Sequence, residues 1–226
     1  MNKIKRFIRN NEFFMYILSF VFNIPFIIEN FIKNIGKLSA IKYSGAFLYR
    51  VHVKNYGRNN TIVIGKACRI RNCTIKVYGD NNKIIVEHDC QLNGMDIWCS
   101  DGSTILIKNH VHVVDSTHIA STEGKMIEIG EKCLFASNIT IRNGDSHSIL
   151  TIDGNRINYA KDVVIGNHVW FGQGVTVLKG TKIGNDCIVG ANSLLSGKEY
   201  FNNLLIVGNP GRSVKENVTW DPEVGR

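Results

Sequence analysis

Large apolar residues recur at every sixth position in the C-terminal part of this chain. They stand at Ile165, Phe171, Val177, Ile183, Val189 and Leu195. Four positions after each of the first five comes a small or β-branched residue, namely Val169, Val175, Thr181, Cys187 and Ser193. An α-helix repeats about every 3.6 residues and a simple strand about every two, so neither period explains the pattern. A period of six instead describes a short strand and a turn, repeated, with two side chains of each unit directed inward.

Three such units make one coil of a triangular prism, so the pattern predicts an all-β fold, a left-handed parallel β-helix of hexapeptide repeats. Glycine and asparagine at the unit boundaries suit strained corner conformations, as in Gly166-Asn167, Gly172-Gln173 and Gly184-Asn185. Each buried aliphatic side chain contributes roughly 1.5–3 kcal/mol, enough for such coils to hold together without conventional helices. The exposed flank of a prism fits association into a closed oligomer, and we expect a homotrimer.

Similar units begin further upstream in a looser register, at Ile64, Val86, Ile107 and Ile129. The residues four positions later are Cys68, Cys90, Val111 and Cys133. With Cys187, these cysteines are predicted to stack inside the prism as small core residues, not as a metal site. None of the 6 cysteines belongs to a C-x-x-C pair, so neither a zinc nor a redox motif is indicated. A disulfide framework would require a secreted context, which the chain does not indicate.

The repeat is interrupted by a long segment, residues 144–162, and resumes at Val163. Its sequence is GDSHSILTIDGNRINYAKD, which contains a histidine, several carboxylates and an arginine. Long excursions from a rigid scaffold commonly carry function. We therefore expect a functional loop inserted near 144–162.

The N-terminal segment is basic at its start and apolar afterwards. Lysines and arginines at positions 3, 5, 6 and 9 precede an apolar run from Phe13 to Ile28, which is broken by Ser19, Asn23 and Pro25. A membrane-spanning helix needs about 20 apolar residues, and no signal-peptide cleavage site follows closely. Two interpretations stay open for residues 1–40: packing on a partner subunit, or peripheral contact with a membrane surface. The expected organisation is a helical extension over 1–58, a β-helix over 59–215 and a tail over 216–226.

The net charge of +8, from 27 Lys and Arg against 19 Asp and Glu, favours anionic partners. Nucleic acid is not indicated, because no dense basic run is interleaved with aromatic residues. A phosphorylated small molecule or an acidic sugar would explain the charge equally well.

The stretch from Asn143 to Trp220 resembles the hexapeptide-repeat O-acetyltransferases that modify bacterial capsule and lipopolysaccharide, relatives of the galactoside and maltose acetyltransferases. The matching pieces are D-S-H-S-I, G-N-R-I-N, I-G-N-H-V-W-F-G-Q-G-V-T-V-L-K-G-T-K-I-G and I-V-G-N-P-G-R. The resemblance implies an acyltransferase that uses acetyl-CoA to acetylate a sugar hydroxyl. It also implies a cytoplasmic enzyme, with peripheral contact at the inner face of the cell membrane left open as an alternative. No metal is expected.

His147 is the candidate general base. An alcohol is a poor nucleophile at neutral pH, and an imidazole is well suited to accept its proton. The family's pattern assigns this role to the histidine of D-S-H-S-I. Asp145 could orient the imidazole, although a backbone carbonyl could do so equally well. Trp170 could donate its indole N–H to the thioester or the departing sulfur, or it could pack at a trimer interface.

The resemblance also implies binding residues. Those matching the pantetheine-lining positions are Gln173, Ala191, Ser196 and Gly197, and Trp170 is a further cofactor-binding candidate. The basic residues expected near the adenosine phosphates are Arg212 and Lys215. Asn143 and Arg156 are candidates for acceptor binding. Arg156 would suit a carboxylated sugar, although a salt bridge within the loop is an equal alternative.

Three rival functions are open. The first is an antibiotic O-acetyltransferase of the same fold. The second is a zinc enzyme resembling the β-helix carbonic anhydrases, for which His110, His112 and His118 would be the ligands. Because His112 and His118 are six residues apart, they are predicted to lie on successive faces of the prism. The third is a non-catalytic scaffold that docks at a membrane through its N-terminus.

Overall fold

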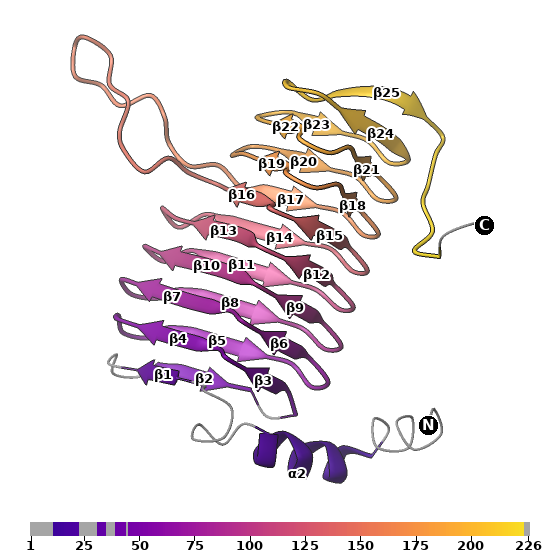
Figure 1. The fold of residues 1–226 in the computed structure, drawn as a ribbon. Helices are drawn as coiled ribbons and strands as arrows, with labels where there is room; N and C mark the ends of the chain where they lie inside the picture. The colour runs from indigo at the N-terminus through magenta and orange to yellow at the C-terminus, as the bar shows by residue number, and fades with distance from the viewer. Residues whose placement is uncertain (1–10, 23–30, 35–38, 44, 224–226) are drawn as a thin grey trace.

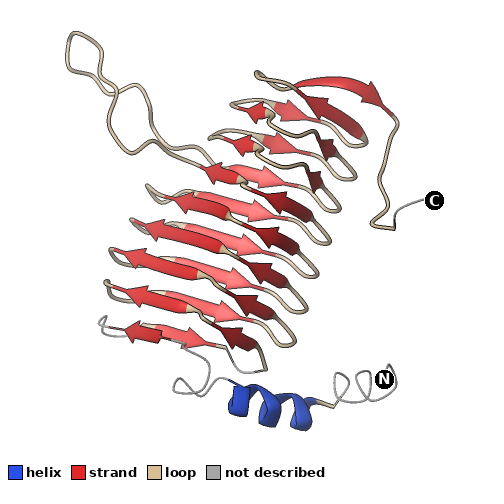
Figure 2. Ribbon diagram, viewed as in Figure 1, coloured by secondary structure: helices blue, strands red, loops and turns tan. Residues whose placement is uncertain are grey.

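The computed structural model describes residues 11–22, 31–34, 39–43 and 45–223. Within these residues the chain winds into a prism of three parallel sheets that stack coil upon coil, with a single helix at its N-terminal end (Figures 1 and 2). The predicted parallel β-helix is confirmed.

Each coil contributes one strand to each sheet. The first sheet contains β1 (Phe31–Asn34), β4 (His52–Asn55), β7 (Thr74–Tyr78), β10 (Met95–Ser100), β13 (Thr117–Ser121), β16 (Thr140–Arg142), β19 (Thr176–Val177) and β22 (Leu194–Leu195). The second contains β2 (Ala40–Lys42), β5 (Thr61–Ile64), β8 (Lys83–Val86), β11 (Thr104–Ile107), β14 (Met126–Ile129), β17 (Val163–Ile165), β20 (Lys182–Ile183) and β23 (Glu199–Tyr200). The third contains β3 (Phe47–Tyr49), β6 (Arg69–Arg71), β9 (Gln91–Asn93), β12 (His112–Asp115), β15 (Leu134–Ser137), β18 (Trp170–Phe171), β21 (Ile188–Val189), β24 (Leu204–Val207) and, antiparallel at its end, β25 (Arg212–Glu216).

The core is the inside of the prism. All eleven positions that the six-residue repeat marks as inward are buried, including Phe171, whose ring packs edge-on against Phe135 with centroids 4.7 Å apart. The cysteines at the predicted inward positions are also buried, and all six cysteines are free thiols. Burial raises the pKa of Cys133 to about 12, so this thiol stays protonated and unreactive at neutral pH.

The corner glycines have a different role from the one expected. At the corner between the second and third sheets, the left-handed residue is His168 or Asp186, with φ of 56° and 59°, and not the preceding glycine or asparagine. Gly166 is required because a Cβ there would lie 2.6 Å from the carbonyl carbon of Gly184 in the next coil. The asparagines join adjacent coils: Asn185 Oδ1 accepts the backbone N–H of Asn167 at 2.8 Å.

The expected helical extension over 1–58 is wrong in its extent. Helix α2 (Glu12–Phe22) is short, and strands of the prism begin at Phe31, so the first coils lie inside the predicted extension. The basic residues at positions 3 to 9 lie outside the described residues. In the part of the chain that is described, no helix has both the length and the apolar character needed to cross a bilayer.

Helix α2 closes the N-terminal end of the prism. Met15 and Ser19 are buried against the first coils, and the Ser19 hydroxyl donates to the carbonyl of Ala46 at 2.6 Å. The rest of the helix leaves large apolar side chains exposed, namely Phe13, Phe14, Tyr16, Ile17, Phe20 and Val21.

Candidate functional site

The segment between β16 and β17 leaves the corner between the first and second sheets and projects far from the prism (Figure 1). Its tip is a hairpin in which Leu150 pairs with Arg156 and Thr151 N–H donates to Asn155 at 2.8 Å. The predicted excursion at 144–162 is therefore confirmed. We call residues 143–162 the projecting loop.

Asn158 joins the two arms of the projecting loop at its base. Its Nδ2 donates to Asp145 Oδ2 at 2.7 Å and to the backbone carbonyl of His147 at 2.8 Å. Its Oδ1 accepts the backbone N–H of Ile149 at 2.7 Å. Asn158 is buried, and it fixes the backbone on either side of His147. Asn158 is the last position of G-N-R-I-N, and no role was predicted for it from the sequence.

Asp145 fastens the projecting loop to the following coil. Its Oδ2 lies 2.5 Å from Nζ of Lys179, which also donates to the carbonyl of Asn158 at 3.0 Å. Lys179, and secondarily the hydrogen bond from Asn158, holds the pKa of Asp145 below its ordinary value. The carboxylate contacts these two groups and not the imidazole, so in this chain it positions the loop backbone around His147.

The His147 side chain is exposed at the base of the loop. Within the described residues its ring has no hydrogen-bond partner, and neither of the two described cavities is lined by it. The neighbouring Ser146 hydroxyl accepts from Arg142 at 2.8 Å. In a single chain the imidazole is therefore exposed to solvent, while the backbone that carries it is held by Asn158.

The two candidates for acceptor binding are both engaged within the chain. Asn143 is fully buried, with Oδ1 accepting from Thr122 N–H at 2.9 Å and Nδ2 donating to Ser121 at 2.8 Å. The expectation that Asn143 contacts an acceptor is corrected, because both polar atoms of its amide are hydrogen-bonded inside the corner that follows β16. Arg156 forms an ion pair with Glu123 at 2.5 Å, so the alternative of a salt bridge holds, although the partner lies between β13 and β14 in the preceding coil and not within the loop.

Trp170 lies on the third sheet, whereas the projecting loop leaves the corner between the first and second sheets. Beside it, Trp220 of the C-terminal tail stacks on the His168 ring at 4.4 Å and donates its indole N–H to the His168 carbonyl at 2.8 Å. The Trp170 and Trp220 rings are 6.1 Å apart. Trp220 was not assigned a role from the sequence, since only the return of the tail along the prism brings it here.

The predicted cofactor-binding residues fall into separate groups. Gln173 and Ala191 stack in adjacent coils at the corner between the third and first sheets. Ser196 and Gly197 follow β22 at the corner between the first and second sheets, where Gly197 N–H donates to Lys179 at 3.2 Å. One chain therefore presents these residues along two different edges of the prism.

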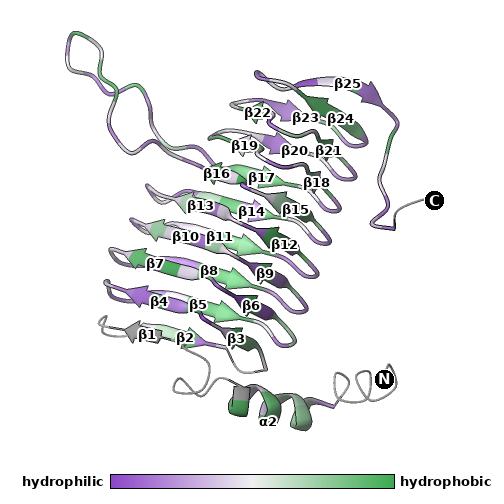
Figure 3. Ribbon diagram, in the orientation of Figure 1, coloured by the Kyte–Doolittle hydropathy of each residue, from purple (hydrophilic) through white to green (hydrophobic). Residues whose placement is uncertain are grey.

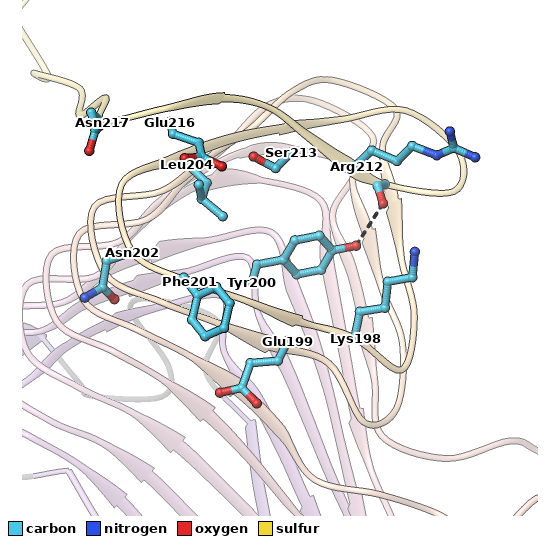
Figure 4. Close-up of a pocket in the computed structure, with 11 residues that line it drawn as sticks. Lys198, Glu199, Tyr200, Phe201, Asn202, Leu204, Arg212, Ser213, Glu216 and Asn217 are labelled. Atoms are coloured by element: carbon cyan, nitrogen blue, oxygen red, sulfur yellow. Dashed lines mark hydrogen bonds between the residues drawn. The ribbon is translucent and has the colours of Figure 1, made fainter.

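Arg212 and Lys215 lie on β25, exposed, at the C-terminal end of the prism. Arg212 also lines a cavity of about 450 Å³ between β25 and the last coil, with Lys198, Tyr200 and Glu216 among its other residues. Figure 4 shows the Tyr200 ring within this cavity, its hydroxyl donating to the Gly211 carbonyl at 3.1 Å.

The histidines of the zinc alternative are not brought together. His118 pairs with Asp96 on the first sheet, and His112 lies on the third, so the predicted placement on successive faces is confirmed. His110 instead lies with His88 and Asp89, where three potential ligand atoms fall within 4.8 Å of one another.

Comparison with known proteins gives a consistent set of relatives. Residues 162–197 match the family model for the bacterial transferase hexapeptide (six repeats). The chain is 36% identical over 165 residues to the polysialic acid O-acetyltransferase of Neisseria meningitidis, covering 73% of this chain and 76% of that protein. It is 30% identical over 126 residues to the polysialic acid O-acetyltransferase of Escherichia coli O1:K1, but this match covers only 40% of that protein.

Solved structures resemble the whole prism. The polysialic acid O-acetyltransferase OatWY superposes with a TM-score of 0.76 at 30% identity, covering 84% of this chain and 92% of that one. The polySia-specific acetyltransferase NeuO gives a TM-score of 0.82 at 25% identity, covering 87% of this chain and 84% of that one. The hexapeptide model begins at residue 162, so the greater part of the projecting loop lies outside it.

Proposed function

The chain belongs to the hexapeptide-repeat O-acetyltransferases, enzymes with a left-handed β-helix fold, and we propose that it transfers the acetyl group of acetyl-CoA to a hydroxyl of a bacterial surface polysaccharide or its precursor. The observation that carries the proposal is the 36% identity over 165 residues to a polysialic acid O-acetyltransferase. Loop geometry supports it, because the backbone around His147 is fastened while the imidazole is left free to meet a substrate.

The proposed mechanism is direct transfer. Nε2 or Nδ1 of His147 removes the proton of the acceptor hydroxyl as its oxygen attacks the thioester carbonyl carbon. The resulting oxyanion is stabilised by a backbone N–H and by the Trp170 indole N–H. When the C–S bond breaks, the imidazolium returns the proton to the departing CoA thiolate. Asp145 acts through the backbone that it and Asn158 hold in place.

We propose that the site is completed by a second copy of the chain. His147 and Trp170 lie on different sides of one prism, and the predicted CoA-binding residues line two different edges. A neighbouring prism would bring its third sheet toward the projecting loop of the first. In this arrangement His147 of one chain and Trp170 of the next would both lie beside the same thioester, as the proposed mechanism requires.

A homotrimer fits the outer face of the second sheet. Half-buried apolar side chains align there in ladder register over consecutive coils, from Val63 through Ile85 to Leu106, and Val164 continues the same row after Glu128. Such a row would be covered by packing against another copy, and closed rings are the usual result of repeated identical contacts.

Acetyl-CoA suits the residues present. Arg212 and Lys215 supply two exposed cations on β25, which fit the phosphates of the adenosine moiety. We place the protein in the cytoplasm, where acetyl-CoA is available. The exposed apolar residues of α2, together with the basic residues before it, would support peripheral contact with the membrane.

The test is an acetylation assay. Purified protein is incubated with acetyl-CoA and either sialic acid oligomers, uronic acid oligomers or neutral oligosaccharides, and the glycans are analysed by mass spectrometry. We expect a mass gain of one acetyl group per modified hydroxyl, with release of free CoA. Chloramphenicol is the comparison acceptor, and its preferential acetylation over every glycan would replace this proposal with that of an antibiotic-modifying enzyme.

A further inference from the structure

A basic groove crosses the outer face of the third sheet near the N-terminal end of the prism. It has a volume of about 180 Å³ and is formed where β6, β9 and β12 lie side by side. Its polar lining consists of Arg69, Arg71, Gln91, Asn93 and His112, with Val114 at one side. Figure 3 shows the hydrophilic character of β6 and β9, in contrast to the hydrophobic β11 of the second sheet.

The two arginines of this groove are available for an anion. They alternate with the inward Ile70, so both guanidinium groups point away from the core. Neither forms an ion pair with any residue that the structure describes, and no carboxylate lines the groove. An arginine without a carboxylate partner, beside amide side chains, is well suited to bind a carboxylate bidentately.

His112 adds a neutral hydrogen-bonding group to the groove. Burial, and then the charge of Arg71, hold the pKa of His112 below its ordinary value. The imidazole is therefore uncharged at neutral pH and can both donate to and accept from sugar hydroxyls. The lining thus combines anion-binding and hydroxyl-binding groups, as an acidic sugar requires.

The groove is in register with Trp170. Arg69, Gln91, His112, Leu134 and Trp170 are consecutive ladder partners on the third sheet. At about 4.8 Å per strand, His112 lies two steps, or about 10 Å, from Trp170. Arg212 and Lys215, proposed for the CoA phosphates, lie toward the C-terminal end. Two cationic regions therefore flank Trp170 along the prism, and the basic groove is the one on the side away from the proposed cofactor.

We propose that the basic groove binds carboxylate-bearing sugar units of the acceptor chain, distant from the unit that is acetylated. This inference rests on the proposed function and specifies its substrate as an acidic polysaccharide. Arg69 and Arg71 pair with the carboxylates, while Gln91 and His112 contact hydroxyl groups. A polymer held there would run along the third sheet toward Trp170.

The experiment compares the full-length wild type with the double variant Arg69→Gln/Arg71→Gln. Arg58→Gln, which removes an exposed arginine from a corner, is the control for charge. Binding of sialic acid oligomers, uronic acid oligomers and neutral dextran oligomers is measured by calorimetry without acetyl-CoA. Acetyl transfer is then measured with whichever glycan is acetylated.

We expect the double variant to bind the acidic oligomer that the wild type prefers at least about tenfold more weakly, with KM for that glycan raised and kcat little changed. The affinity for CoA and the oligomeric state should be unchanged, and the difference should shrink as salt is added. Arg58→Gln should behave as wild type.

Several results would overturn the inference. One is that the double variant and the wild type bind the glycan with equal affinity. Another is that the wild type binds neither acidic glycan. A third is that the protein assembly dissociates in the double variant. Acetylation of neutral glycans alone would reject the groove and leave the proposed function intact. Arginine-dependent binding of an acidic oligomer, without acetyl transfer to any glycan, would support the basic groove and reject the proposed function.

Discussion

Lys179 Nζ lies 2.5 Å from Asp145 Oδ2, although the two residues are 34 positions apart in the chain. The contact joins the base of the projecting loop to the coil that follows it. Since Asn158 links Asp145 to the backbone of His147, the lysine holds the proposed general base in place without touching it.

Replacing Lys179 should loosen the loop while leaving the prism intact. In Lys179→Met we expect faster amide hydrogen exchange over 145–158, unchanged exchange in the core strands, and kcat/KM reduced by about tenfold because His147 is less well positioned. Lys182→Met, which removes an exposed lysine from β20 in the same coil, is the matched control. Equal exchange in both variants would show that the ion pair does not hold the loop.

Acid should release the same loop. The pKa values of Asp145 and Glu123 are both lowered, by Lys179 and by Arg156 respectively, from ordinary values of 3.8 and 4.5. A carboxyl group with a lowered pKa stabilises the folded arrangement fully above its ordinary pKa and progressively less as pH falls through the lowered value. The loop should thus be fastened at neutral pH and become mobile below about pH 4.

A spin label attached through Ile152→Cys would report this change, because the native cysteines are all buried. Label mobility should rise as the pH falls below about 4, through the lowered pKa values of the two carboxyl groups, before the far-ultraviolet circular dichroism of the prism is lost. Constant mobility down to the pH of global unfolding would contradict the prediction.

His147→Ala should lower kcat by at least about a hundredfold, because the acceptor hydroxyl loses its general base. The dissociation constant for CoA should not change. The control is His110→Ala, which removes an exposed histidine from a corner of the prism. Activity of His147→Ala close to that of wild type would reject the assignment of the base.

Mixed oligomers should reveal whether the site is shared. Chains carrying His147→Ala and chains carrying Trp170→Ala are each expected to be nearly inactive alone. When they are co-expressed in equal amounts, about a quarter of the sites should combine the intact histidine and tryptophan, and activity should return. Activity no higher than that of the separate variants would place both residues in one chain's site.

Thr181 offers a test of the core. It occupies an inward position of the repeat, fully buried, and its hydroxyl has no hydrogen-bond partner. Thr181→Val should therefore raise the free energy of unfolding by about 1 kcal/mol, measured by denaturant titration. Ser193→Ala is the contrast, since Ser193 accepts the backbone N–H of Gly208 at 3.0 Å and its loss should destabilise the protein. A fall in stability for Thr181→Val would contradict this explanation.

The six-residue period predicted the prism because it directly reflects which side chains face inward. The coils before Ile64 were not recognised because their short strands carry polar side chains, as in β4. Only ladder pairing, such as Ala40 with Thr61, shows that this segment belongs to the prism. For this reason the predicted helical extension, residues 1–58, was longer than the helix that the structure shows.

The site was only partly predictable for a similar reason. D-S-H-S-I identified His147 and its loop, but the hydrogen bonds that position it join residues of different coils. Asn143 was predicted as a candidate for acceptor binding. Its amide is instead satisfied inside the corner by Ser121 and Thr122, a relationship that depends on stacking and leaves no trace in local sequence.

The strands of the third sheet pair one-to-one, so the distance between two positions on its outer face is set by the number of coils between them. Because each coil adds about 4.8 Å, the number of coils between Arg69 and Trp170 sets the spacing from the anchored sugar to the reactive one. Deleting one coil would shorten that spacing by a single increment and leave the chemistry at both ends unaltered. Gain or loss of a coil during evolution could thus change which sugar unit of the polymer is acetylated, with no change to the residues that perform the transfer.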